Sequence, residues 1–132
     1  MLTCSVIGAT SFTGSELIRI LARHPRVRIG ALTTRSEEKM DARDLVPSLG
    51  KTSSLTIEKW SQKEVAQISD VVFLTLPHTQ AVKTAGAFFD QGKVVIDLSA
   101  DFRLRSGRTY EQWYHEPHGR KDLLGTAVYG LP

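Results

Sequence analysis

The segment from Gly8 to Gly14, Gly-Ala-Thr-Ser-Phe-Thr-Gly, joins an apolar run to a stretch with helical periodicity and could bind a phosphate. A strand that turns sharply into a helix presents unpaired N–H groups where the helix dipole favours an anion. Gly8 would permit the tight turn, and Gly14 would let the helix pack closely on the sheet. The dinucleotide-binding fingerprint has glycine where this chain has Ser11, whose side chain either crowds a pyrophosphate or donates a hydrogen bond to it. The candidate cofactor-binding residues here are Gly8, Thr10, Ser11, Phe12, Thr13 and Gly14.

Arg35 follows the second predicted strand and stands between Thr34 and Ser36. In NAD-binding units a carboxylate at this point bonds the ribose hydroxyls, whereas an arginine accommodates a 2′-phosphate. No acidic residue precedes Glu37, and Arg35 can form bidentate, charge-assisted hydrogen bonds to a phosphate. The spacing from Gly8 to Arg35 suits one strand–helix–strand unit. The two features together predict an NADP site; packing glycines and a solvated arginine are the alternative.

Two further groups of polar residues follow predicted strands, where the ligands of open α/β sheets collect. His78 comes after Pro77 at the end of one strand, and it is either a ligand contact or a histidine at a helix start. Ser99, Asp101 and Arg103 follow the next strand. Arg103 could hold a substrate carboxylate or phosphate, while Asp101 either shares that role or orients the arginine.

The chain offers no clear nucleophile and no metal site. Cys4 is the one cysteine and lies inside the first predicted strand, where we expect a small buried core residue. A single cysteine cannot form an intramolecular disulfide, and its presence alone favours a reducing, cytoplasmic location. His115 and His118 have a spacing that metal ligands can have, but no other ligands converge on them, so we expect no metal.

Apolar runs typical of buried strands alternate with amphipathic stretches, which predicts an α/β fold with a doubly wound, mainly parallel sheet, that is, a Rossmann-like domain. A capping box at Thr13 and Glu16 is expected to open the first helix. The last thirty residues are less regular, apart from a short helix over 110–114. The predicted strands are 2–7, 27–33, 55–57, 70–76 and 93–98, and the predicted helices are 13–24, 41–46, 62–68 and 79–90.

Length and composition fit one globular domain. The 132 residues include 41% hydrophobic and 23% charged residues, which excludes disorder and collagen-like sequences. The net charge is only +3, from 17 basic and 14 acidic residues that are interleaved, so we expect no nucleic-acid partner. The uncharged, largely apolar run 71–82 is too short to span a membrane, so we expect no membrane partner either.

Six motifs, taken in order, resemble the N-acetyl-γ-glutamyl-phosphate reductase family, which is related to aspartate-semialdehyde dehydrogenase. The resemblance covers essentially the whole chain, and the fourth and sixth motifs are its most specific part. The motifs are Gly8–Gly14, Thr34-Arg35-Ser36, Leu76-Pro77-His78, Ile96–Arg103, Tyr110–Tyr114 and Val128-Tyr129-Gly130-Leu131-Pro132.

The resemblance implies NADPH-dependent reduction of an acyl phosphate to an aldehyde through a cysteine thioester. It places Leu76, Pro77, His78 and Ser99 at the cofactor and Asp101 and Arg103 at the substrate. The family's catalytic cysteine and histidine lie beyond the Tyr-Gly-Leu-Pro motif, so residues 1–132 are expected to be a single dinucleotide-binding domain without the catalytic and dimerisation domain. The small acyl-phosphate substrate and a homo-oligomeric parent enzyme are implied in the same way.

Two other functions remain open at this point. One is a non-enzymatic NADP-binding module. The other is the lysine-pathway reductase of a carrier-linked α-aminoadipyl phosphate, which shares these motifs.

Overall fold

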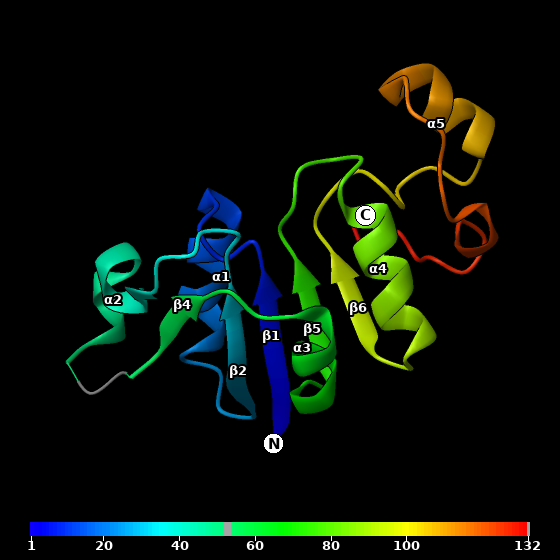
Figure 1. Cartoon of the computed structure of the whole chain (residues 1–132). Helices are drawn as coiled ribbons and strands as arrows, with labels where there is room; N and C mark the ends of the chain where they lie inside the picture. The colour runs from blue at the N-terminus through cyan, green and yellow to red at the C-terminus, as the bar shows by residue number, and fades with distance from the viewer. Residues whose placement is uncertain (52–53, 132) are drawn as a thin grey trace.

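The computed structural model describes residues 1–51 and 54–131, and within these ranges six strands form one sheet in the order β3-β4-β2-β1-β5-β6 (Figure 1). Pro132, the last residue of the sixth motif, lies outside the described residues. The strands are β1 Leu2–Ile7, β2 Val27–Thr33, β3 Met40–Asp41, β4 Thr56–Glu58, β5 Val71–Leu74 and β6 Val94–Asp97. The helices are α1 Phe12–Leu21, α2 Ala42–Leu45, α3 Gln62–Ile68, α4 Ala81–Asp90 and α5 Gly107–Tyr114, with 3₁₀ turns at Pro47–Leu49 and Lys121–Leu123.

The sheet is parallel except at one edge. Strand β1 pairs in parallel with β2 and β5, and β5 pairs in parallel with β6; only β3 runs antiparallel to its neighbour β4 among the described strands. The chain therefore starts in the middle of the sheet and builds outward in both directions. The predicted doubly wound α/β fold is confirmed.

Two groups of buried side chains lie on opposite faces of the sheet. Cys4 and Val6 of β1 pack with Ile18 of α1, whereas Val72 and Leu74 of β5 pack with α3 and α4. Successive side chains of a strand point to opposite faces, so β1 and β5 are covered on both sides. Cys4 is 3% exposed and is the small core residue that its position in β1 predicts. No helix in the described ranges is long and apolar enough to cross a bilayer.

Strand β6 differs from the prediction of a fully buried strand. It is the edge strand of the sheet, and Val94 and Ile96 are 58% and 41% exposed. A uniformly apolar run is typical of a strand with two covered faces, but the run does not say whether a further element covers it. Here the face bearing Val94 and Ile96 lies open.

The C-terminal segment is less regular, as predicted, yet it packs on the domain. Tyr110 of α5 is fully buried, and His118 and Leu124 are each 3% exposed. The Arg120 guanidinium forms an ion pair with Asp90 at the end of α4, with an Nη1–Oδ2 distance of 2.8 Å. The helix predicted over 110–114 is observed as α5, one turn longer at its start.

Candidate cofactor site

The candidate site lies at the carboxyl edge of the sheet, where strand order reverses around β1. The turns that follow β1, β2, β5 and β6 all emerge at this edge because the four strands are parallel (Figure 1). In open α/β sheets this is where ligands bind. The predicted residues of all four turns are thereby brought to one side of the sheet.

Gly8 makes the turn after β1 possible. Its backbone φ is +86°, a conformation that residues with a Cβ adopt at a cost. A Cβ on Gly8 would also lie 2.9 Å from the carbonyl oxygen of Thr75, whose hydroxyl donates to the carbonyls of Ile7 and Gly8 at 2.9 and 2.8 Å. Gly8 is therefore required by conformation and by the close approach of the segment after β5.

Ser11 is the N-cap of α1, not Thr13 as predicted. The backbone of Ser11 is extended, and its Oγ accepts a hydrogen bond from the N–H of Gly14 at 2.9 Å. The serine that replaces the fingerprint glycine thus bonds its own helix. A Cβ on Gly14 would lie 2.7 Å from the carbonyl oxygens of Gly8 and Ala9, so Gly14 permits close packing against the turn itself.

The first turn of α1 is suited to an anion. The α-helical hydrogen bond at the start of α1 runs from the N–H of Ser15 to the carbonyl of Ser11, so the N–H groups of Phe12 and Thr13 have no carbonyl one turn earlier in the helix. No acidic side chain stands in this turn. Thr10 is exposed beside it, and Phe12 is 97% exposed.

Arg35 lies across the site from the loop that precedes α4. Its Nη2 donates to the Oε1 of Gln80 at 2.5 Å, and both side chains are exposed. The Thr34 hydroxyl accepts a hydrogen bond from the N–H of Ser36 at 3.2 Å, which shapes the turn that carries Arg35. The predicted arginine and the predicted loop therefore meet at the site, through a glutamine that the sequence analysis did not single out.

The loop between β5 and α4 presents His78 toward α5. Leu76 is half-buried, whereas Pro77 and His78 are exposed at the carboxyl edge. The His78 ring lies 5.5 Å from the ring of Tyr114, measured between centroids. The next residue, Thr79, has a φ of +68°.

Asp101 does not line the site, which corrects the prediction of a substrate contact. Its side chain has no exposed surface. Oδ1 accepts from the N–H of Thr79 at 2.6 Å and from the Tyr110 hydroxyl at 2.8 Å, while Oδ2 accepts from the N–H groups of Ala81 and Val82 at 2.9 and 3.1 Å. Asp101 therefore caps α4 from inside the protein.

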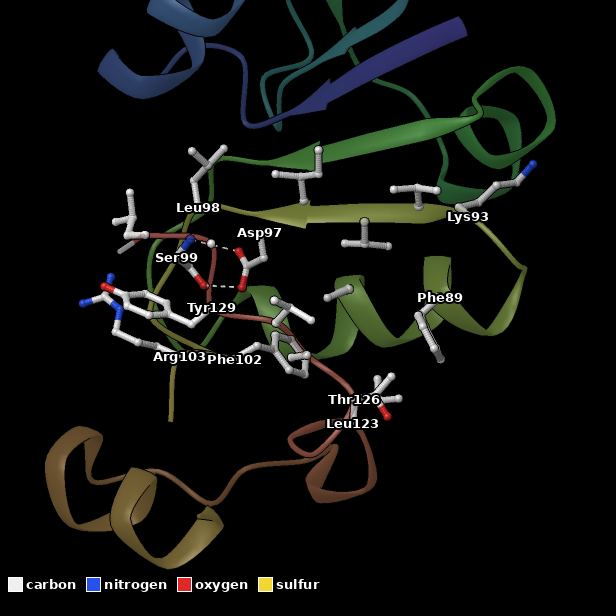
Figure 2. A pocket seen from close by; sticks show the side chains of 18 residues that line it. Phe89, Lys93, Asp97, Leu98, Ser99, Phe102, Arg103, Leu123, Thr126 and Tyr129 are labelled. Carbon is white, nitrogen blue, oxygen red and sulfur yellow. Dashed lines mark hydrogen bonds between the residues drawn. The ribbon is translucent and has the colours of Figure 1, made fainter. Parts of the chain in front are cut away.

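Ser99 and Arg103 lie beside a cavity of about 790 Å³ between β6 and the C-terminal segment (Figure 2). The N–H and hydroxyl of Ser99 donate to the two carboxylate oxygens of Asp97 at 2.9 and 2.8 Å. Burial raises the pKa of Asp97, against the opposing effect of the Ser99 hydrogen bonds. The Arg103 guanidinium is exposed and lies 5.9 Å from the centroid of the Tyr129 ring.

Residues 3–132 match the family model described as the semialdehyde dehydrogenase, NAD binding domain. The chain belongs to this family. It is 46% identical over 132 residues to N-acetyl-gamma-glutamyl-phosphate reductase from Moorella thermoacetica, covering 100% of this chain and 38% of that protein. It is 47% identical over 128 residues to the reductase of the same name from Pelotomaculum thermopropionicum, covering 97% of this chain and 37% of that protein. The chain thus spans less than two fifths of the length of these curated relatives.

A solved structure shares the fold. Aspartate semialdehyde dehydrogenase with NADP from Candida albicans superposes with a TM-score of 0.62 and 24% sequence identity, over 78% of this chain and 31% of that one. At this level of identity the likeness supports the architecture of the sheet and its helices.

Within this semialdehyde dehydrogenase domain, the two remaining titratable candidates, Cys4 and His118, are buried side chains that belong to the packing of the fold. Burial, and to a smaller degree the nearby Asp70, raise the pKa of the Cys4 thiol, which disfavours the thiolate that a nucleophile needs. The Nε2 of His118 lies 2.8 Å from the backbone oxygen of Asp101, in the same buried cluster as Tyr110. Residues 1–51 and 54–131 contain no group of three or more His, Cys, Asp or Glu side chains placed to hold a metal ion.

Sequence reasoning missed the contribution of Gln80 and Tyr110. Gln80 had no signal, because one glutamine in a polar loop is compatible with any surface role. Tyr110 stood in a recognised motif, but its burial against Asp101 depends on how the C-terminal segment folds back on α4. The Asp101 carboxylate, which lies in the loop after β6, looks the same in sequence whether it faces a ligand or a helix start.

Proposed function

We propose that this chain is the NADP-binding part of an N-acetyl-γ-glutamyl-phosphate reductase. One observation carries the proposal. The glycine turn after β1 and Arg35 after β2 lie at the same sheet edge, in a chain 46% identical along its length to a protein of that name. The relatives' names favour this substrate over the carrier-linked aminoadipyl phosphate. Because residues 3–132 match an NAD binding domain and the chain spans 38% of such a relative, the proposal assigns it the cofactor-binding part of the reductase.

The described residues fit an NADP molecule. The close approach at Gly8 and the open N–H groups of the first turn of α1 suit a pyrophosphate. Arg35, with the hydroxyls of Thr34 and Ser36, would hold the 2′-phosphate and so select NADP over NAD. When bound, the cofactor would supply a hydride to the acyl carbon of the substrate.

His78 and Ser99 are proposed to lie on the nicotinamide side, because they follow β5 and β6. Leu76 and Pro77 shape the wall between them and the glycine turn. Arg103 is proposed to attract the anionic acyl phosphate, for which its exposed guanidinium is suited.

The overall reaction consumes the acyl phosphate, NADPH and a proton, and it yields the aldehyde, NADP⁺ and inorganic phosphate. The acyl carbon is reduced by the hydride, and the bond from this carbon to the phosphate oxygen breaks. A thiolate nucleophile and a histidine base are needed, and the resemblance places both outside these 132 residues. We therefore propose that the chain alone binds NADPH without catalysing the reaction; a cytoplasmic, homo-oligomeric parent enzyme stays a prediction.

Calorimetric titration of the chain with NADPH and with NADH tests the proposal. We expect NADPH to bind more tightly by roughly ten- to over a hundredfold, since a phosphate–arginine contact contributes about 1.5–3 kcal/mol. Equal affinity for the two cofactors would overturn the NADP assignment, and absence of binding would overturn the cofactor site itself.

A second assay tests the expected lack of turnover. Phosphate-dependent oxidation of N-acetylglutamate semialdehyde can be followed as NADPH formation. We expect no formation by the purified chain. Turnover that disappears in a Cys4→Ser variant would contradict both the missing nucleophile and the structural position of Cys4.

A further inference from the structure

Thr79 has a backbone conformation that its residue type disfavours. Its φ of +68° lies in the left-handed region, which costs a residue with a Cβ about 1–2 kcal/mol and is uncommon for β-branched side chains. Such conformations persist only where surrounding contacts enforce them, and they gather at ligand-binding sites. Thr79 is itself exposed, so packing of its side chain does not enforce this one.

The Asp101 carboxylate supplies the enforcing contact. Its Oδ1 accepts from the N–H of Thr79 at 2.6 Å, and its Oδ2 accepts from the N–H groups of Ala81 and Val82, the first two residues of α4. Hydrogen bonds to an ionised carboxylate are stronger than those between neutral groups. One buried side chain thus fixes both the end of the loop and the start of the helix.

Asp101 is held from the opposite side by the C-terminal segment. The Tyr110 hydroxyl donates to Oδ1 at 2.8 Å, and His118 lies against the Asp101 backbone oxygen and edge-on to the Tyr110 ring. Burial is the main cause that raises the pKa of Tyr110, and the hydrogen bond to Asp101 is the second. The hydroxyl therefore keeps its proton and can donate the hydrogen bond to the carboxylate. The backbone N–H of Asp101 in turn donates to the Ser99 hydroxyl at 3.1 Å.

The residues on either side of Thr79 lie at the carboxyl edge of the sheet, where the candidate cofactor site is. Gln80 accepts the hydrogen bond of Arg35, and His78 precedes Thr79 at the carboxyl edge of β5. A change of φ at Thr79 from the left-handed region to the ordinary one would redirect both neighbours. The position of these two side chains therefore depends on Asp101, which accepts a hydrogen bond from the backbone N–H of the residue between them.

We propose that Asp101 is a positioning residue for NADPH binding, which acts by holding Thr79 in the left-handed conformation that orients His78 and Gln80. This inference rests on the proposed cofactor site. It differs from a substrate contact, because the carboxylate is buried and works through the loop.

The test compares the NADPH affinity of the wild-type chain with that of the Asp101→Asn variant, both measured by calorimetry. Asparagine has the same shape but turns an amide N–H₂ toward backbone N–H groups, so we expect about a tenfold loss of affinity. The double variant Asp101→Asn/Thr79→Gly should recover most of this loss, because glycine adopts a positive φ without the carboxylate. Failure of the rescue in a folded double variant would overturn the inference.

Tyr110→Phe is the matched control. It removes one hydrogen bond from the same carboxylate but leaves the three bonds to the loop and helix, so it should lower thermal stability with little change in NADPH affinity. A merely structural Asp101 would give the opposite pattern, in which affinity follows stability in every variant. That result, or an unchanged affinity in folded Asp101→Asn, would overturn the inference.

Thr79→Pro covers the case in which Asp101→Asn does not fold. Proline removes the N–H group that donates to Asp101 and fixes φ near −65°. Thr79→Gly, at the same exposed site, keeps this N–H group. We expect Thr79→Pro to lose affinity and Thr79→Gly to keep it; equal affinity would overturn the inference. A wild-type chain that binds no NADPH would instead overturn the proposed function, and this inference with it.

Discussion

The Arg35 guanidinium donates a hydrogen bond to the Gln80 side-chain oxygen at 2.5 Å, across 45 residues of chain. The bond joins the end of β2 to the loop before α4, which are separated in the sheet by β1. Both side chains are exposed, so the bond adds little to the stability of the fold. Its consequence is that Arg35 is held over the edge where the glycine turn emerges.

Arg35→Ala should therefore weaken NADPH binding and leave NADH binding nearly unchanged. The expected loss is roughly ten- to over a hundredfold, because a charge-assisted contact with the 2′-phosphate contributes about 1.5–3 kcal/mol. Calorimetry with both cofactors measures it. Arg23→Ala, which removes an exposed arginine after α1, is the control for the loss of one positive charge. An equal loss for NADPH and NADH would show that Arg35 does not contact the 2′-phosphate.

The Ser11 N-cap gives a second prediction, on stability. Ser11→Ala removes the acceptor of the Gly14 N–H and should lower the free energy of unfolding by about 1 kcal/mol, whereas Ser11→Gly should cost only a few tenths. Ser15→Ala is the control inside the same helix, where alanine is the better helix former. Urea denaturation of the three variants measures the differences. A Ser11→Ala variant as stable as wild type would mean that the hydroxyl does not cap α1.

A third prediction compares Gly8 with Gly92. It separates the need for a positive φ from the need for space where a Cβ would lie. Both have positive φ, +86° and +71°, but a Cβ on Gly8 would meet the Thr75 carbonyl at 2.9 Å while one on Gly92 meets nothing within 4 Å. Gly92→Ala should thus cost only the conformational penalty of about 1–2 kcal/mol. Gly8→Ala should cost about 1–3 kcal/mol more, because the strands must shift. Equal losses in denaturant would contradict the close contact.

Most of the elements could be predicted from periodicity because burial on two faces leaves uniform apolar runs. The strands around Val6 and Val72 and the helix Gln62–Ile68 agree with the prediction closely. The prediction that β6 is fully buried was wrong, because the edge strand of this sheet has the same uniformly apolar sequence as a central strand. The two-residue strand β3 was not predicted, since two residues carry no periodicity.

The residues of the candidate site that could be predicted are those that depend on nearby sequence, and those that could not be predicted depend on long-range contacts. The turn at Gly8 and the arginine at 35 depend on residues close in sequence to a strand end, and the structure brings them to one edge as the spacing predicts. Asp101 depends on contacts with α4 and α5 that lie nine to twenty-two residues away. Local sequence carries no information on which side of the loop its carboxylate turns.

A fourth prediction concerns Asp97, whose pKa burial raises above the ordinary value of about 3.9 for aspartate. The native state then binds a proton more tightly than the unfolded state does. The resulting stabilisation is fully present below the unfolded pKa and is lost as the pH rises through the higher folded pKa. Asp97 should therefore weaken the fold at neutral pH relative to a neutral side chain of the same shape.

Asp97→Asn supplies that side chain, since its oxygen can still accept from the Ser99 N–H and its amide can donate to the Ser99 hydroxyl. The stability of the variant relative to wild type should rise with pH above 3.9 and reach a plateau once wild-type Asp97 is ionised. Urea denaturation across this range measures the difference, and a ¹³C titration of the carboxyl locates the pKa. Asp44→Asn controls for the loss of one negative charge at an exposed position. An Asp97 that titrates at or below 3.9 would mean that the Ser99 hydrogen bonds and the nearby Arg103 outweigh its burial.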